Sequence, residues 1–244
     1  MTTNVIKLPP RTAAHSRVRA IWTDFGGVLT PPVSETMASF AARLGTTAEL
    51  LRSAMEQVGR SLGTDMMAPL DTPLLTEQQW ARQVEQVLLA HHGVRTDLST
   101  FGARWFEGRP ANQHWVQFLL ALRAAGWFVG MLSNMVPSWE EHWRRMVPAS
   151  QLFDAVISSH QVGCRKPELA IFELAAARAG VAPDQCVLVD DLEANCIGAR
   201  AAGWQAVHFQ ETAQAATELG RLLIARPGAA MSASGTATWM TASK

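Results

Sequence analysis

The alternation of short apolar runs with amphipathic segments constrains the fold of this chain more than any other feature. Five runs have the length and composition of buried strands, at residues 19–25, 127–133, 154–159, 186–190 and 205–209. Amphipathic segments with helical spacing lie between the later runs, at residues 112–125, 138–147, 167–180 and 193–202. Such alternation is typical of a parallel sheet with helices on both faces. We therefore expect an α/β fold built on a doubly wound parallel sheet.

Residues 31–109 break this alternation, because they contain no convincing strand. Their apolar spacing predicts helices instead, at residues 34–44, 47–60, 76–92 and 97–106. Thr76 and Gln79 have the spacing of a capping box, as do Ser138 and Glu141 later in the chain. Loops that leave the carboxyl ends of the strands surround the ligand site of such sheets. We therefore expect an all-helical cap over that site.

The domain boundaries follow from these patterns. The predicted α/β core consists of residues 19–30 and 110–225, and the helical cap, residues 31–109, is inserted between its two parts. Residues 1–18 read as a flexible leader. Residues 226–244 are rich in Ala, Ser, Thr and Gly without a helical stripe, which is typical of a flexible tail.

The composition excludes several classes of partner. Basic and acidic side chains balance at 21 each, whereas a nucleic-acid surface usually carries a basic excess. No apolar run approaches the roughly 20 residues of a membrane span, and the N-terminal stretch has no segment suited to a signal peptide. The cysteines, Cys164, Cys186 and Cys196, lack CxxC spacing, which favours reduced thiols and no zinc site. We expect a cytoplasmic monomer or homodimer that binds neither nucleic acid nor membrane.

Polar residues follow four of the predicted strands. They are Asp24 after the first, Ser133 and Asn134 after the second, Lys166 on the loop after the third, and Asp190 and Asp191 after the fourth. Each of these signals alone also fits an ordinary turn or helix start. Because ligands of doubly wound sheets bind beyond the carboxyl ends of the strands, the ordered set predicts one shared cleft.

These side chains together favour phosphate chemistry. Crowded carboxylates repel one another unless a cation neutralises them, and Mg²⁺ prefers oxygen ligands and commonly binds a substrate phosphate as well. Lys166 can neutralise phosphate oxygens, and Ser133 and Asn134 can donate hydrogen bonds to them. An aspartate such as Asp24 can attack phosphorus to form an aspartyl-phosphate. We expect a Mg²⁺-dependent hydrolase of a small phosphorylated organic molecule, which acts mainly by positioning and charge neutralisation.

Four segments of the chain resemble the haloacid dehalogenase-like (HAD) hydrolase superfamily, in the family's order. They read "DFGGVLT", "LSN", "VGCRKPELAIFELAAARAGV" and "VLVDDLEANCIGARAAGW". The resemblance covers about residues 18–210, and its later part is similar to the branch that contains the phosphatase domain of bifunctional epoxide hydrolases. It implies a Rossmann-like core with a helical cap inserted between the first and second motifs, and phosphatase activity.

The resemblance also implies which residues are catalytic and which hold the metal. By motif position, Asp24 would be the nucleophile and a Mg²⁺ ligand. The main-chain carbonyl of Gly26 and the carboxylate of Asp191 would complete the protein's share of the metal ligands.

The remaining motif residues would support phosphate and metal. Ser133, Asn134 and Lys166 would bind the substrate phosphate, with Lys166 also part of the catalytic set. Asp190 and Asn195 would support the metal site from behind its direct ligands.

The sequence departs from the family at Gly26, where active phosphatases usually carry a second aspartate. That aspartate protonates the leaving oxygen, and general acid–base catalysis typically contributes about 10²–10⁴-fold. Three consequences stay open. The substrate has a good leaving group, such as an acyl phosphate; a cap residue or the substrate supplies the proton, with Asp65, Asp71 and His91 as candidate acids; or the enzyme is slow or inert. Arg109, where the cap returns to the core, is either a group that reaches the leaving oxygen or an ordinary surface arginine.

Rival functions follow from the same segments. A catalytically impaired protein would use the cleft only to bind phosphate. A haloacid dehalogenase needs no metal, so the pair Asp190 and Asp191 argues against that chemistry. Phosphonate cleavage needs a cap lysine, and the only lysines are Lys7, Lys166 and Lys244.

The predicted cap carries several Met and Trp residues, among them Met55, Met66, Met67, Trp80 and Trp105. Such residues suit the lining of a site for a partly apolar substrate, and at helical spacing they equally suit simple packing.

Overall fold

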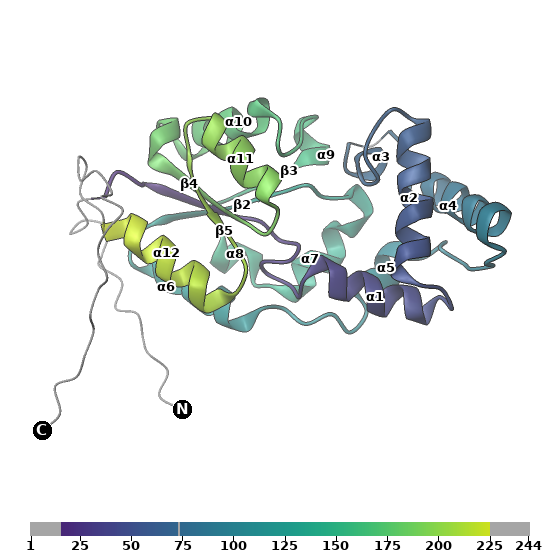
Figure 1. Ribbon diagram of the computed structural model, residues 1–244. Helices are drawn as coiled ribbons and strands as arrows, with labels where there is room; N and C mark the ends of the chain where they lie inside the picture. Colours follow the sequence, from purple (N-terminus) through teal and green to yellow (C-terminus); the bar gives the residue numbers. More distant parts are fainter. Residues whose placement is uncertain (1–15, 73, 225–244) are drawn as a thin grey trace, which may run out of the picture.

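The structure is a computed structural model, and it describes residues 16–72 and 74–224 (Figure 1). The flexible tail predicted for residues 226–244 lies outside the described residues, as does the predicted leader except for residues 16–18.

One parallel sheet forms the centre of the molecule, with strand order β3-β2-β1-β4-β5 (Figure 1). The strands are β1 Ala20–Thr23, β2 Phe128–Ser133, β3 Ala155–Ser158, β4 Cys186–Asp190 and β5 Gln205–His208. All five strands expected from the sequence are present, which confirms the doubly wound α/β fold. The first strand is central and pairs with β2 on one side and β4 on the other. The carboxyl ends of these three strands therefore meet around Asp24.

Helices cover both faces of the sheet because successive side chains of β1 point to opposite sides. Ile21 joins the core cluster that contains the buried side chains of α6 (Gln113–Ala124) and α12 (Thr212–Ile224). Trp22 joins a second cluster with α10 (Leu169–Ala179) and α11 (Glu193–Ala201). Gly130 of β2 pairs with Trp22, and a Cβ atom there would lie 2.4 Å from the indole ring. A glycine at this position gives the large ring its space.

The other helical segments of the core are short. They are η2 Pro137–Trp139, α7 Glu140–Met146, α8 Ala149–Leu152, α9 Ser159–Val162 and η3 Pro183–Gln185. The capping box expected from Ser138 and Glu141 is wrong, because α7 begins after Trp139 and the Ser138 hydroxyl donates to Glu77 of the cap. A contact with a distant element has displaced the local cap.

Residues 31–109 are helical, as the sequence predicts, and lie beside the sheet at the end where α2 and α4 are labelled (Figure 1). Their helices are α1 Val33–Arg43, α2 Ala48–Ser61, α3 Ala68–Asp71, α4 Glu77–His92 and α5 Phe101–Phe106. The capping box of Thr76 and Gln79 is present at the start of α4. Met55 and Trp80 are fully buried in this helical part, so their role there is packing.

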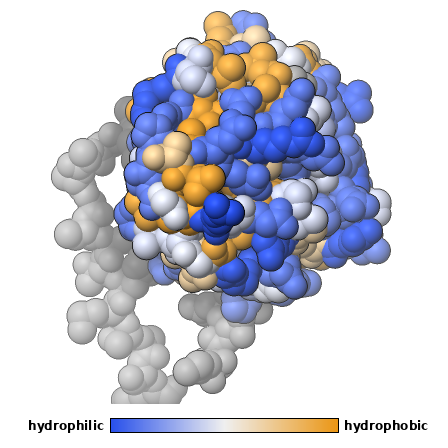
Figure 2. Space-filling view, turned by 90° about the vertical axis from the view of Figure 1, so that its right-hand side faces the viewer, coloured by the Kyte–Doolittle hydropathy of each residue, from blue (hydrophilic) through white to orange (hydrophobic). Residues whose placement is uncertain are grey.

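The surface at the cap end is largely hydrophilic, with hydrophobic patches between the hydrophilic residues (Figure 2). Within the described residues, no helix is both long and apolar enough to cross a membrane.

An aromatic seam joins the cap to the core. Trp105 of α5 stacks on Trp139 with ring centroids 6.0 Å apart, and Phe106 meets the same indole edge-on at 5.4 Å. Phe25, which follows Asp24, lies 6.4 Å from Phe106. The cap is therefore packed directly against the turn that carries the predicted nucleophile.

Candidate active site

The turn after β1 holds Asp24 at the tip of the central strand. The Asp24 amide donates to the carbonyl of Val189 at 2.9 Å, which extends the pairing of β1 with β4 by one residue. The Thr23 hydroxyl donates to the Asp24 carbonyl at 3.0 Å and accepts from Trp115 Nε1 at 3.1 Å. Burial raises the pKa of the Asp24 carboxyl, and the charge of Lys166 opposes this effect.

Lys166 joins two of the predicted carboxylates. Its Nζ lies 2.9 Å from Asp24 Oδ1 and 2.5 Å from Asp190 Oδ2, and the side chain is 1% exposed. Burial alone lowers the pKa of a lysine, but Asp190 and Asp24 outweigh burial and hold the pKa of Lys166 above its ordinary value. Lys166 is therefore a fixed positive charge at the strand ends.

Asp190 has donors for both of its carboxylate oxygens. Oδ1 accepts from the Leu192 amide at 3.0 Å and from Asn195 Nδ2 at 2.9 Å, and Oδ2 is bound by Lys166. Asn195 comes from the first turn of α11, which begins at Glu193. Asp190 therefore positions Lys166, and its carboxylate has little remaining capacity to bind a metal cation.

Asp191 is arranged differently. Within residues 16–72 and 74–224, no side chain of another residue hydrogen-bonds to its carboxylate. Burial, together with the negative charges of Asp24 and Asp190, raises the pKa of Asp191 to about 7. Gly27 lies directly against this carboxylate, because a Cβ atom on it would be 2.1 Å from Asp191 Oδ2. Its φ of 74° is also in the region that favours glycine. Only a glycine fits that close approach.

The carboxylates of Asp24, Asp190 and Asp191 each place one oxygen within 4.8 Å of the others. Three buried or half-buried carboxylates at this spacing carry more negative charge than Lys166 alone balances. The donors are all oxygen, which hard divalent cations prefer. The residues present therefore fit a hard divalent cation such as Mg²⁺.

The structure brings the predicted phosphate-binding residues to the same strand ends. Ser133 ends β2 and is buried. The Asn134 side chain holds the Lys166 backbone twice, since Nδ2 donates to its carbonyl at 2.9 Å and Oδ1 accepts from its amide at 2.8 Å. The Asn134 side chain therefore positions the Lys166 backbone, and its Nδ2 keeps a second N–H that these two bonds do not use.

Position 26 has room for the side chain that the sequence lacks there. A Cβ on Gly26 would meet only Val33 Cγ2 at 3.6 Å, which is an ordinary contact, and its φ lies outside the region that favours glycine. Neither sterics nor backbone conformation requires a glycine here.

A model of the haloacid dehalogenase-like hydrolases matches residues 18–203. The chain belongs to this family. The match runs from β1 through α11 and includes the helical segment at residues 31–109.

Curated relatives of this HAD-like hydrolase are phosphatases. It is 34% identical to a glyceraldehyde 3-phosphate phosphatase of Methanothermobacter thermautotrophicus over 36% of the chain and 40% of that protein. It is 33% identical to a phosphoserine phosphatase of Thermus thermophilus over 69% of the chain and 74% of that protein. The chain thus spans less than half of the first relative and about three quarters of the second.

Solved structures share the fold. A HAD family enzyme from Bacteroides thetaiotaomicron, in complex with magnesium and inorganic phosphate, matches with a TM-score of 0.57 at 20% identity, over 78% of this chain and 93% of that one. Solved dehalogenases match the same fold. At these identities the likeness establishes the fold alone.

A second charged group near the site was not evident from the sequence. Arg165, next to Lys166, is bound by the cap carboxylates of Asp65 and Asp71, the latter at 2.8 Å. Ser159 adds a hydrogen bond to the Asp71 carbonyl at 2.7 Å and accepts from the Met135 amide at 3.0 Å. The partners are 94 and 100 residues apart in the chain, so no local pattern could have paired them.

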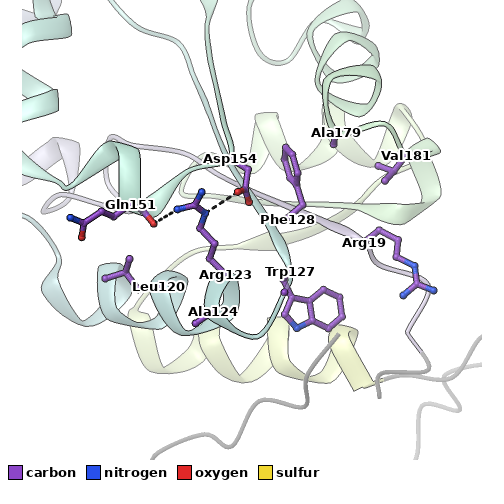
Figure 3. Close-up of a pocket in the computed structure, with 11 residues that line it drawn as sticks. Arg19, Leu120, Arg123, Ala124, Trp127, Phe128, Gln151, Asp154, Ala179 and Val181 are labelled. Carbon is purple, nitrogen blue, oxygen red and sulfur yellow. Dashed lines mark hydrogen bonds and ion pairs between the residues drawn. The ribbon is translucent and has the colours of Figure 1, made fainter. Parts of the chain in front are cut away.

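A separate cavity of about 770 Å³ lies at the opposite end of the sheet (Figure 3). It is lined by Arg19, Trp127 and Phe128, which stand at the amino ends of β1 and β2. Arg123 crosses it to Asp154 at 2.8 Å. Because the strands are parallel, this cavity lies at the amino ends of the strands, and Asp24 lies at their carboxyl ends. The cavity is therefore not part of the candidate site.

Proposed function

We propose that this hydrolase is a Mg²⁺-dependent phosphatase of a small phosphorylated organic molecule, acting through an aspartyl-phosphate on Asp24. The observation that carries the proposal is the arrangement of carboxylate oxygens of Asp24, Asp190 and Asp191 within 4.8 Å around a buried lysine. The phosphatase names of the curated relatives support the same substrate class.

The metal would be held by Asp24, Asp191 and the main-chain carbonyl of Gly26. When bound, Mg²⁺ supplies positive charge that neutralises the crowded carboxylates and the phosphate oxygens. Asp190 serves the site indirectly, since its oxygens hold Lys166 and accept from Asn195.

The phosphate would lie beside Ser133 and Lys166, with the backbone amide of Asn134 as a further donor. Lys166 keeps its proton because two carboxylates face it, so it serves as a fixed charge and does not act as a base. The Asn134 side chain fixes the backbone of Lys166 and so aligns the two donors.

The chemistry would proceed in two displacements at phosphorus. Asp24 attacks in line, the bond between phosphorus and the leaving oxygen breaks, and its electron pair stays on the leaving oxygen. Water then attacks the phosphorus of the aspartyl-phosphate and releases inorganic phosphate with Asp24 restored. No acid occupies position 26, so the departing oxygen takes its proton from water.

Two other functions are less well supported. A dehalogenase would not need the acidic group at Asp190 and Asp191. A protein that only binds phosphate would keep the same cleft. It would differ from the proposed phosphatase only in that it does not hydrolyse the bound ester.

Release of inorganic phosphate from a panel of phosphate monoesters and acyl phosphates tests the proposal. We expect turnover that requires Mg²⁺, is lost on chelation, and falls by more than about 10³-fold in Asp24→Asn. Asp184→Asn, at an exposed position away from the site, is the control and should keep full activity. Phosphate binding without release in the unsubstituted protein would instead support a binding protein, and release of halide from haloacids would support a dehalogenase.

We also place the protein in the cytoplasm. All three cysteines are free, and burial raises the pKa of Cys186 and of Cys196 to about 12, so these two thiols are unreactive at neutral pH.

A further inference from the structure

The empty position 26 raises the question of which group faces the leaving oxygen. Asp65 and Asp71, two candidates from the cap, are both bound by Arg165. The charged groups that act on Asp71 are Arg165, Asp65 and Glu168, none of which belongs to the acidic cluster of the site. His91 bonds to Gln57 between α2 and α4 of the cap. These side chains are engaged elsewhere.

Arg109 lies where the cap returns to the core, and its side chain bonds to the turn that follows β1. Its Nη2 donates to the Thr30 hydroxyl at 2.6 Å, and that hydroxyl also accepts from the Gly27 amide at 3.1 Å. The guanidinium is therefore linked to the same turn that carries Asp24 and Gly26.

Two aromatic rings lie beside this guanidinium. Arg109 Cζ lies 5.4 Å from the ring centre of Trp105 and 5.9 Å from that of Phe106. Both rings belong to the seam that packs the cap on the core, so the arginine is held by rigid neighbours and not by solvent-exposed side chains.

Arg109 carries its positive charge close enough to Asp24 and Asp191 for their charges to act on it. Burial lowers the pKa of Arg109 to about 10, although the charges of Asp24 and Asp191 oppose this effect. Within the described part of the chain neither carboxylate forms an ion pair with Arg109. Its Nε is buried and has no acceptor among the described residues. A buried charged donor without an acceptor is costly, so the guanidinium keeps unsatisfied hydrogen-bonding capacity beside this turn.

We propose that Arg109 is a specificity-determining residue of this phosphatase, stabilising the negative charge on the leaving oxygen where position 26 has no acid. The inference rests on the proposed function. During attack by Asp24 the bond to phosphorus breaks and the electron pair moves to the leaving oxygen. Arg109 keeps its own proton and stabilises that oxygen by charge and hydrogen bonding until water protonates it. Esters with poor leaving groups, such as alkyl phosphates, then become substrates.

Leaving-group dependence tests this role. We would measure kcat/KM for 4-nitrophenyl phosphate, phenyl phosphate and an alkyl phosphate with Mg²⁺ present. Loss of one preorganised donor typically costs about 10²–10³-fold, so Arg109→Met should lower the alkyl ester rate by about 10²-fold. The loss should be much smaller for the nitrophenyl ester, whose leaving group needs little stabilisation. Arg109→Lys should recover part of the alkyl activity.

Two further variants separate this role from a structural one. Arg43→Met removes another cation that lines the same cavity of about 210 Å³ beside Trp105, and it should leave the leaving-group dependence unchanged. Gly26→Asp in the Arg109→Met protein should restore alkyl ester activity, because position 26 has room for a side chain.

The failure of this inference is distinguishable from failure of the proposed function. An equal loss on all three esters, or no loss, in a folded Arg109→Met protein would overturn the leaving-group role while the phosphatase activity stands. Absence of phosphate release from every ester by the unsubstituted protein would overturn the proposed function itself, and the inference with it.

Discussion

At the scale of single residues, Lys166 is the centre of the site's electrostatics. It is almost fully buried and contacts Asp24 and Asp190 together. Burying a charge is costly unless it is paired and hydrogen-bonded, and each of these three groups depends on the others for that pairing. The contacts that would position Lys166 for a phosphate under the proposed function therefore also stabilise the fold.

Removing the lysine charge should be strongly destabilising. Lys166→Met leaves Asp24 and Asp190 buried without their cation, and we expect the free energy of unfolding to fall by about 3–5 kcal/mol. Urea unfolding at neutral pH without Mg²⁺ measures this loss. Arg17→Met breaks the exposed ion pair with Asp184 and should cost less than about 1 kcal/mol. Similar small losses in both variants would contradict the described role of Lys166.

Most of these residues could be located from the sequence because each follows its own strand. Parallel pairing then carries Asp24, Ser133 and Asp190 to one edge of the sheet. The division of labour between Asp190 and Asp191 needs the structure. It depends on Leu192 and Asn195, which bind Asp190 and leave Asp191 open. Nothing in two adjacent aspartates indicates which one has its oxygens occupied.

At the scale of elements, the contact between cap and core was beyond prediction. The sequence predicts the helices of residues 31–109 well, since local spacing and the Thr76 capping box specify them. It fails where a distant partner decides the outcome. Ser138 bonds to Glu77 in place of capping its own helix, and Arg165 pairs with carboxylates of the cap loop.

The burial of Asp71 should make stability depend on pH. Burial raises the pKa of Asp71 from 3.8 to about 6 despite the opposing charge of Arg165, while Asp65 and Glu168 add to the rise. The folded protein therefore binds this proton more tightly than the unfolded chain does. Its stabilising contribution is fully present below about pH 4 and is lost as the pH rises to about 6.

Urea unfolding of the unsubstituted protein and Asp71→Asn across this range tests that sign. The difference in the free energy of unfolding between the two proteins should fall by up to about 3 kcal/mol from pH 4 to pH 7. Asp97→Asn is a useful control, because hydrogen bonds from Ser99 lower the pKa of Asp97, and any slope there should have the opposite sign. A difference that is constant with pH for Asp71→Asn would contradict the burial argument.

At the scale of the whole molecule, the fold places the candidate site between the carboxyl ends of the strands and the helices of residues 31–109. The parallel sheet and the helices on both faces were predicted, because five apolar runs alternate with helical segments. The strand order β3-β2-β1-β4-β5 comes from the structure. The helix α12 was missed, although its buried Ala215, Ala216, Leu219 and Leu223 recur at helical spacing. The aromatic seam was also missed, since packing residues of the cap carry no local sign of their partners.

The central claim is that Asp24 becomes phosphorylated during turnover, and mass spectrometry of acid-quenched protein tests it most directly. The protein would be mixed with Mg²⁺ and a good substrate from the ester panel, quenched within the first turnover, and digested for peptide mapping. We expect one added phosphoryl group, located on Asp24 and absent in Asp24→Asn. Rapid release of phosphate with no phosphoryl group on Asp24 at any quench time, or its appearance on another residue, would contradict the account.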